Sequence, residues 1–186
     1  IHETHPVQYA EGMEKMEAGE IEAAYDIMDK LVKENPLFED ALVGLALSAR
    51  SSQKMEIAIS TISRILNLNP ENALAYNLSG LMAAEAENME GAIKLFKLAI
   101  KKDPNFLDAR RNYAEILLMS GAFQEGVDEL VAILNKYPED IVTLLRMLQL
   151  NLEAERSDEA LKLAERILKV DPEEPNALGI VENLEK

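Results

Sequence analysis

Apolar residues recur along this chain at the spacing of short amphipathic helices. Near the N-terminus, Ile21, Ala24, Ile27, Met28 and Leu31 lie three or four residues apart, which places them on one face of a helix. No run of about 18 apolar residues occurs, so we expect no transmembrane segment in this chain. The pattern predicts two helices within residues 73–106 and further helices over residues 7–18, 21–34, 40–50, 55–68, 108–119, 123–136, 142–154 and 157–170.

Two series of residues in register show that the helices come in repeated pairs. Proline recurs every 34 residues, at Pro36, Pro70, Pro104, Pro138 and Pro172. Small residues precede each proline at a fixed distance, at Ala24, Ala58, Ala92, Gly126 and Ala160. A further small position, filled by Gly12, Ala46, Gly80 and Ala114, holds Leu148 in the last pair, which predicts a slightly wider helix spacing there. A fixed period of this length is typical of helix–turn–helix solenoids.

The copy in residues 73–106 combines Tyr76, Gly80, Ala92, Phe96 and Ala99 with the closing proline. This order of aromatic, small and alanine positions resembles the tetratricopeptide repeat. The resemblance implies an all-α fold, a right-handed α-α superhelix built from antiparallel helix pairs. It predicts one continuous array, with a frayed N-terminus (residues 1–6), five repeats within residues 7–174 (5–38, 39–72, 73–106, 107–140 and 141–174) and a C-terminal capping helix (175–186).

Charge and composition narrow the range of partners. The 186 residues carry a net charge of −15, which argues against nucleic acid, since Lys and Arg must neutralise its phosphates. Residues 5–38 hold 8 acids and 3 bases, so a basic partner docking there is an alternative to a simple solvated surface. The chain begins with Ile1 and contains no cysteine. We expect a cytoplasmic protein, with a periplasmic or membrane-associated location as the alternative if an N-terminal signal or anchor was removed.

The sequence offers no recognisable reactive centre. It contains no Gly-rich phosphate loop, no His-Glu-x-x-His motif and no calcium-loop pattern. His2 and His5 have a metal-ligand spacing but lack further ligands, and the Ser-x-x-Lys match from Ser51 to Lys54 has no companion motif. We therefore expect a protein that is not an enzyme, with no catalytic residue, cofactor or metal.

The resemblance to tetratricopeptide proteins implies that the first helix of each pair lines an inner, concave face. Many inner positions here are apolar, which favours a groove for an amphipathic helix or an apolar peptide. The alternative is that these residues pack between repeats. The candidate partner-binding residues are Tyr9, Met13, Val43, Leu47, Leu74, Asn77, Leu81, Arg111, Asn112, Leu118, Leu145, Arg146 and Gln149.

One specialised binding mode of this family is not supported. Tetratricopeptide co-chaperones hold the C-terminal carboxylates of heat-shock proteins with a clamp of Lys, Asn and Arg. Asn112 and Arg146 match that clamp. Asn77 and Val142, however, stand where it needs Lys, and Leu81 stands where it needs its first Asn. A carboxylate requires several converging donors, so we reject the clamp. Arg111, Asn112 and Arg146 are expected to form a small polar patch beside the apolar groove.

The function that follows is a scaffold for protein–protein interaction, which binds a protein or peptide partner and assembles or localises a larger complex. Two alternatives stay open. One is a self-assembling, homo-oligomeric protein recruited to a membrane-associated complex, since the chain resembles the magnetosome-associated tetratricopeptide protein and the lipoproteins of pilus, secretin and exopolysaccharide-export systems. The other is a regulatory module of a larger chain.

Overall fold

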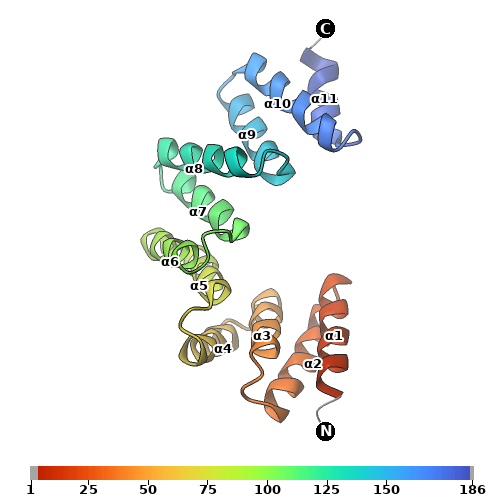
Figure 1. Ribbon diagram of the computed structural model, residues 1–186, viewed down its shortest axis with the longest axis vertical. Coiled ribbons are helices and arrows are strands. Elements are labelled where there is room, and N and C mark those ends of the chain that lie inside the picture. The colour runs from red at the N-terminus through yellow and green to blue at the C-terminus, as the bar shows by residue number, and fades with distance from the viewer. Residues whose placement is uncertain (1–3, 185–186) are drawn as a thin grey trace. The chain divides into compact units, whose positions relative to one another are not determined.

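The structure is a computed structural model that describes residues 4–184 (Figure 1). Within this range the chain forms eleven helices and no strand. Helix α1 begins three residues earlier than the sequence predicts, whereas most other ends lie within two residues of the prediction. The helices are α1 (Thr4–Glu17), α2 (Ile21–Glu34), α3 (Glu39–Ser51), α4 (Met55–Leu68), α5 (Ala73–Glu85), α6 (Met89–Lys102), α7 (Leu107–Met119), α8 (Phe123–Lys136), α9 (Ile141–Glu153), α10 (Ser157–Val170) and α11 (Pro175–Leu184).

The turn inside each helix pair has the same left-handed conformation in all five repeats. The N–H of the residue after the turn donates to a carbonyl five residues back, as from Lys54 to Ala49 at 2.8 Å. This bond is the mark of a Schellman motif, which requires a left-handed residue at the helix C-terminus. The residues with positive φ are Gly19 (76°), Gln53 (60°), Glu87 (58°), Gly121 (87°) and Glu155 (56°). Only the two glycines among them are residue types that favour this conformation, so only these two turns could be located from residue type.

The proline turns between pairs are fixed by the residue before the proline. In four repeats an Asn or Asp side chain accepts a hydrogen bond from the N–H two residues later, as when Glu71 donates to Asn69 Oδ1 at 3.1 Å. This Asx turn orients the chain into the next helix. Tyr137 precedes the proline of the fourth repeat, and its phenol oxygen lies at the far end of the ring, too far from the backbone to form an Asx turn.

The chain divides into two compact units, Ile1–Phe106 and Leu107–Lys186, which are called unit 1 and unit 2 below. Unit 1 contains α1–α6, and its core includes Met28, Leu42, Ile65 and Leu78. Unit 2 contains α7–α11 and holds two apolar clusters, one around Ile133 and one that extends to the final helix. The boundary falls between the third and fourth repeats, a division that the uninterrupted repeat series does not predict.

Contact between the two helices of a pair depends on matching a small residue with a large one. A Cβ placed on Gly80 of α5 would lie 2.6 Å from Cε1 of Phe96 on α6, so only glycine fits there. In the last pair the sizes are exchanged. Leu148 of α9 and Ala164 of α10 are both buried in one cluster of unit 2. The small residue on α10 therefore supplies the room that Leu148 needs.

The sequence predicts neither a transmembrane segment nor a metal site. No helix among the described residues has both the length and the apolar character needed to cross a membrane. Residue His2 and the side chain of His5 lie outside the described residues. In the part of the chain that the structure describes, no group of three or more His, Cys, Asp or Glu side chains could hold a metal ion.

Candidate partner-binding face

In unit 1 the first helices of the three pairs carry a set of half-buried apolar side chains. We call this set the apolar face: Tyr9, Met13, Val43, Leu47, Leu74 and Leu81. Each of the six packs against the buried core of unit 1 while keeping part of its surface accessible. The two interpretations made from the sequence, a binding surface and packing between repeats, therefore apply to the same residues.

The N-terminal end of the apolar face is aromatic. The rings of Tyr9 and Phe38 lie 5.7 Å apart between centroids and are tilted by 56°, an arrangement that aromatic pairs favour. Asp40, in the first turn of α3, is exposed and close enough to act on the Tyr9 phenol. Burial, and secondarily the negative charge of Asp40, raises the pKa of Tyr9 above its ordinary value. The phenol therefore stays protonated at neutral pH.

The other end of the face carries an ion pair. Arg50 of α3 donates to Oε1 of Glu85 on α5, from Nε at 3.0 Å and from Nη2 at 2.5 Å. The pair joins two first helices of neighbouring repeats, and both side chains remain partly exposed. The charge of Arg50 is thus already matched within the chain.

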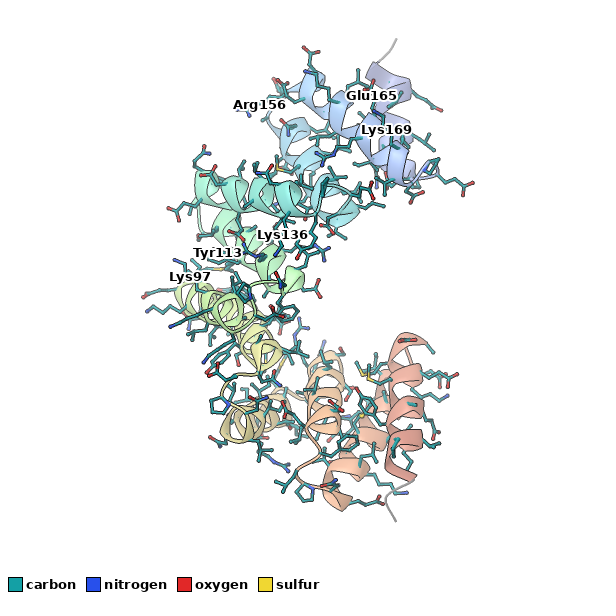
Figure 2. All side chains as sticks on the ribbon, in the orientation of Figure 1. Lys97, Tyr113, Lys136, Arg156, Glu165 and Lys169 are labelled. Carbon is teal, nitrogen blue, oxygen red and sulfur yellow. The ribbon has the colours of Figure 1, made fainter. Side chains whose placement is uncertain are left out.

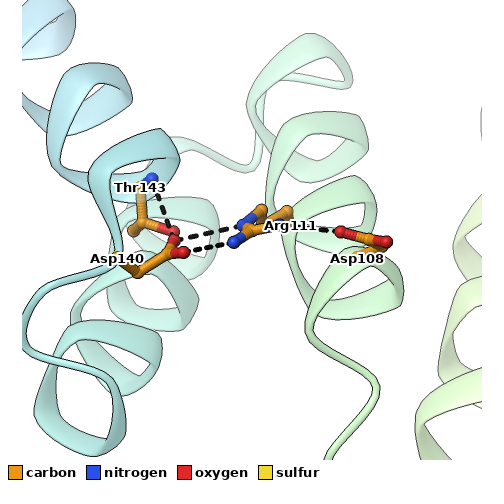
Figure 3. A network of polar contacts seen from close by, with 4 residues as sticks. All are labelled: Asp108, Arg111, Asp140 and Thr143. Carbon is orange, nitrogen blue, oxygen red and sulfur yellow. Dashed lines mark hydrogen bonds and ion pairs between the residues drawn. The ribbon is translucent and has the colours of Figure 1, made fainter. Parts of the chain in front are cut away.

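In unit 2 the corresponding positions of α7 are polar, whereas α9 also carries exposed apolar side chains, Val142 and Leu152. Arg111 on α7 is the centre of a polar network (Figure 3). The guanidinium donates to both carboxylate oxygens of Asp140, with Nε 3.1 Å from Oδ2, and to Asp108 Oδ1 at 2.7 Å. The backbone N–H of Thr143 donates to the same Asp140 carboxylate at 3.0 Å, so Asp140 also caps the N-terminus of α9. One carboxylate therefore joins α7 to α9 and begins a helix.

The charges of this network shift the pKa of Asp140. Its burial alone would raise that pKa, because it disfavours the charged carboxylate. Hydrogen bonds from Arg111 and Thr143 outweigh burial, and the pKa of Asp140 lies below its ordinary value. The carboxylate is consequently ionised at neutral pH and holds Arg111 in place.

A second ion pair lies further along α7 and α9. Arg146 donates to both oxygens of Glu115, from Nε at 2.7 Å and from Nη2 at 3.0 Å. Nearby on α9, Gln149 Nε2 donates to Glu153 Oε1 at 2.8 Å, and Leu145 packs against the core of unit 2. Asn112 is half-buried. The patch of Arg111, Asn112 and Arg146 stays a prediction, and in the structure both arginines have acidic partners within the chain.

Two of the candidate residues are buried and offer little surface to a partner. Asn77 and Leu118 are each 4% exposed. Leu118 turns inward because Gly126 stands where other repeats have alanine. A Cβ on Gly126 would lie 2.8 Å from Leu118 Cγ, so the missing methyl makes room for the leucine. The inner-face assignment of Leu118 is corrected on this ground.

Sequence reasoning missed the acidic partners of the two arginines. Glu115 and Asp140 lie 31 and 29 residues from Arg146 and Arg111, respectively. A signal was present, because this spacing joins neighbouring first helices in a repeat of 34 residues. Several other charged side chains of unit 2 lie on the solvent-exposed surface. Examples are Arg156, Glu165 and Lys169, which are labelled in Figure 2.

Comparison with known proteins agrees with the geometry. Two sequence models of the tetratricopeptide repeat family match residues 44–105 and 83–148, which together make up more than half of the chain. The chain is a tetratricopeptide repeat protein. Proteins with such repeats are in general interaction modules rather than enzymes, and the repeat array of this chain is a scaffold for protein interaction.

Solved structures share this fold at low sequence identity. Pseudomonas aeruginosa PilF is 17% identical with a TM-score of 0.78, over 98% of this chain and 83% of that one. A thermophilic tetratricopeptide repeat protein of Thermus thermophilus is 17% identical with a TM-score of 0.79, over 98% of this chain and all of that one. A MamA protein is 19% identical with a TM-score of 0.65, over 92% and 94% of the two chains. These likenesses assign the chain to the tetratricopeptide solenoid fold.

Peroxisomal targeting signal receptors of yeasts are similar in sequence over a shorter stretch. The receptor of Candida glabrata is 25% identical over 103 residues, or 55% of this chain. That of Saccharomyces cerevisiae is 27% identical over 93 residues, or 50% of this chain. The matched stretches are 18% and 15% of the two receptors, so the chain spans less than a fifth of these relatives.

Proposed function

We propose that this chain is a non-enzymatic adaptor that binds a peptide or an amphipathic helix on the apolar face of unit 1. The observation that supports it is the set of six half-buried apolar side chains on α1, α3 and α5. Partly exposed apolar groups in register on neighbouring helices suit the i, i+3, i+4 stripe of a docked helix. Met13 adds an adaptable side chain, which suits a surface that accepts more than one apolar sequence.

The similarity to receptors named for a targeting signal supports the same class of function. Those proteins are named as receptors of a targeting signal, and the chain to which they are similar is an array of tetratricopeptide repeats. One solved relative, YrrB, is described as having an unusual peptide-binding site, and its TM-score with this chain is 0.62. The placement of a peptide on unit 1, and a role in assembling or localising a complex, are our proposals for this chain.

The test uses a phage-displayed library of random peptides selected on the full chain. Leu47→Glu and Leu81→Glu each place a charge within the apolar face and should abolish recovery of the enriched peptides. Ile59→Glu is the matched control, because Ile59 is 56% exposed on α4 and lies outside the apolar face. Circular dichroism should show that all three variants remain folded. Equal recovery by the folded Leu47→Glu variant and by the Ile59→Glu control would refute the proposal.

A second candidate function is self-assembly through the C-terminal helix. Helix α11 packs through Ala177, which is fully buried, yet it leaves Leu178 39% exposed. A terminal helix with an accessible apolar side chain can dock on a second copy of the chain. Sedimentation velocity should then show an oligomer that Leu178→Glu dissociates. A monomer at high protein concentration would exclude this function.

A further inference from the structure

We propose that the partner bound on the apolar face carries a Lys or Arg side chain that pairs with Asp40. This inference rests on the proposed function of that face and specifies the chemistry of its partner. It comes from a comparison of charged residues that occupy equivalent positions on the first helices of the two units.

Five charged residues occupy the inner positions of the first helices, namely Asp40, Arg50, Asp108, Arg111 and Glu115. Four of them form ion pairs within the chain, with Arg50 bound to Glu85, Arg111 to Asp108 and Asp140, and Glu115 to Arg146. Asp40 is exposed and, among the described residues, has no ion-pair partner. Among these five residues, Asp40 is therefore the one whose charge is open to a partner.

The repeat itself shows what a carboxylate at this position binds. Asp108 lies at the position of Asp40, two repeats later, and accepts a hydrogen bond from the Arg111 guanidinium at 2.7 Å. In unit 1 the position of Arg111 is occupied by Val43, which belongs to the apolar face. The basic group is therefore missing from unit 1 while its carboxylate is kept. A partner's Lys or Arg would take the place that Arg111 fills in unit 2.

The surroundings of Asp40 favour a basic side chain over a neutral one. The centroid of the Tyr9 ring lies 5.7 Å from that of Phe38, two residues before Asp40, and a cation is attracted to the face of an aromatic ring. The chain already contains such a contact, in which Lys54 Nζ lies 3.6 Å from the centroid of the Tyr25 ring and pairs with Glu22. The overall charge of −15 adds a longer-range attraction for a basic segment.

The test extends the peptide selection and uses the most enriched phage peptide, synthesised with a fluorescent label. Enriched sequences should combine apolar residues with a Lys or Arg. Replacing that residue by Gln should weaken binding to the native chain by about two- to fivefold, the range for a partly exposed ion pair. The same replacement should have no effect on binding to Asp40→Asn. Asp26→Asn is the matched control, because Asp26 is an exposed aspartate on α2 outside the apolar face, and it should retain the full difference.

The outcomes separate this inference from the proposed function. Peptides that bind, depend on Leu47 and lack a basic residue, or show no coupling to Asp40, would overturn the pairing and leave the apolar face as a binding site. A dimer of the chain dissociated by Asp40→Asn would assign the surface to a second copy and overturn the pairing with a foreign segment. Peptides unaffected by Leu47→Glu would overturn both proposals. Since Asp40 lies in the first turn of α3, thermal unfolding should confirm that Asp40→Asn leaves the fold intact.

Discussion

In unit 1 the side chains of Tyr9 and Phe38 bring two aromatic rings together, whereas three repeats later Arg111 and Asp140 fill the equivalent positions with an ion pair. The same exchange occurs further along the helices. Leu78 lies in the core of unit 1 and half-buried Leu47 packs against that core, whereas Glu115 and Arg146 form a hydrogen-bonded pair at the equivalent positions of unit 2. One backbone frame thus accepts apolar or charged contacts between neighbouring first helices.

The difference between apolar and charged contacts corresponds to two roles in a repeat protein, which are holding neighbouring helices in register and binding a partner. The ion pairs of unit 2 are directional and bind the first helices to each other in one register, so little of their bonding capacity is left for a partner. The apolar contacts of unit 1 are not directional, and half-buried side chains there keep accessible surface. The comparison leads us to place partner binding on unit 1 and to assign the charges of unit 2 to structure.

The largest effect is expected at Asp140. Asp140→Ala removes the cap of α9 and leaves the Arg111 guanidinium without its main partner, so we expect a loss of about 2–4 kcal/mol in the free energy of unfolding. Asn72→Ala is the matched variant in unit 1. Asn72 occupies the equivalent position, caps α5 through a 2.8 Å bond from Ala75 N and donates to Glu39 Oε1 at 2.7 Å. It pairs with no arginine, so its loss should be smaller, about 1–2 kcal/mol. Urea denaturation measures both, and equal losses would contradict the structural role of the ion pair.

A smaller effect is expected from pH. Asp140→Asn keeps a side chain able to cap α9 but removes the charge. Because the pKa of Asp140 is lowered in the folded state from an ordinary value of 3.8, the charge contributes stability above that value. This contribution is lost as the pH falls through the lower folded-state pKa. The difference in unfolding free energy between the native chain and Asp140→Asn should therefore be constant near neutral pH, begin to fall below about pH 4 and vanish only once the pH is below the folded-state pKa. A difference that persists in acid would assign the effect to packing.

The ion pair of Glu115 and Arg146 can be converted into the apolar contact of unit 1. Each side chain is partly exposed, at 44% and 24%, so Glu115→Leu or Arg146→Leu alone should cost only about 1 kcal/mol. The double variant should lie within about 0.5 kcal/mol of the native chain, because two leucines replace the pair as in unit 1. A thermodynamic double-mutant cycle by urea denaturation measures the coupling. If the losses of unfolding free energy in the two single variants simply add in the double variant, the backbone of unit 2 does not accommodate a leucine pair at these positions.

The sequence is sufficient to predict the fold because the fold depends on local and periodic signals. The proline turns, the small residues at helix contacts and the amphipathic stripes each recur every 34 residues, and they define the helix pairs with most ends correct to within two residues. Family resemblance supplies the inner face of the first helices. The tetratricopeptide matches and the solved structures confirm the repeat family and the all-α fold.

The details of the face depend on contacts that the sequence does not rank. Arg111 has two acidic partners in the structure. The repeat spacing brings Asp140 to the neighbouring first helix, but it does not show that this acid, among the many of the chain, forms the main contact. Leu118 is buried through the single methyl group that Gly126 lacks. Ion pairing and burial of this kind depend on contacts between side chains of different helices. The 34-residue period alone does not predict these contacts. The candidate residues of the binding face therefore remain a prediction.

The smallest effect concerns the turn that both units share. Gln53 and Glu87 in unit 1 and Glu155 in unit 2 adopt positive φ at the place where Gly19 and Gly121 stand in their repeats. A left-handed conformation costs a residue with a Cβ more than it costs glycine, so replacing any of the three by glycine should stabilise the chain by about 0.5–1 kcal/mol. Gly121→Ala should destabilise it by a similar amount, since no atom lies near its Cβ and only the backbone conformation opposes the change. Thermal unfolding measures these shifts. Because the turn is the same in both units, Glu87→Gly and Glu155→Gly should have equal effects, and a marked inequality would show that the units differ in their backbone as well as on their faces.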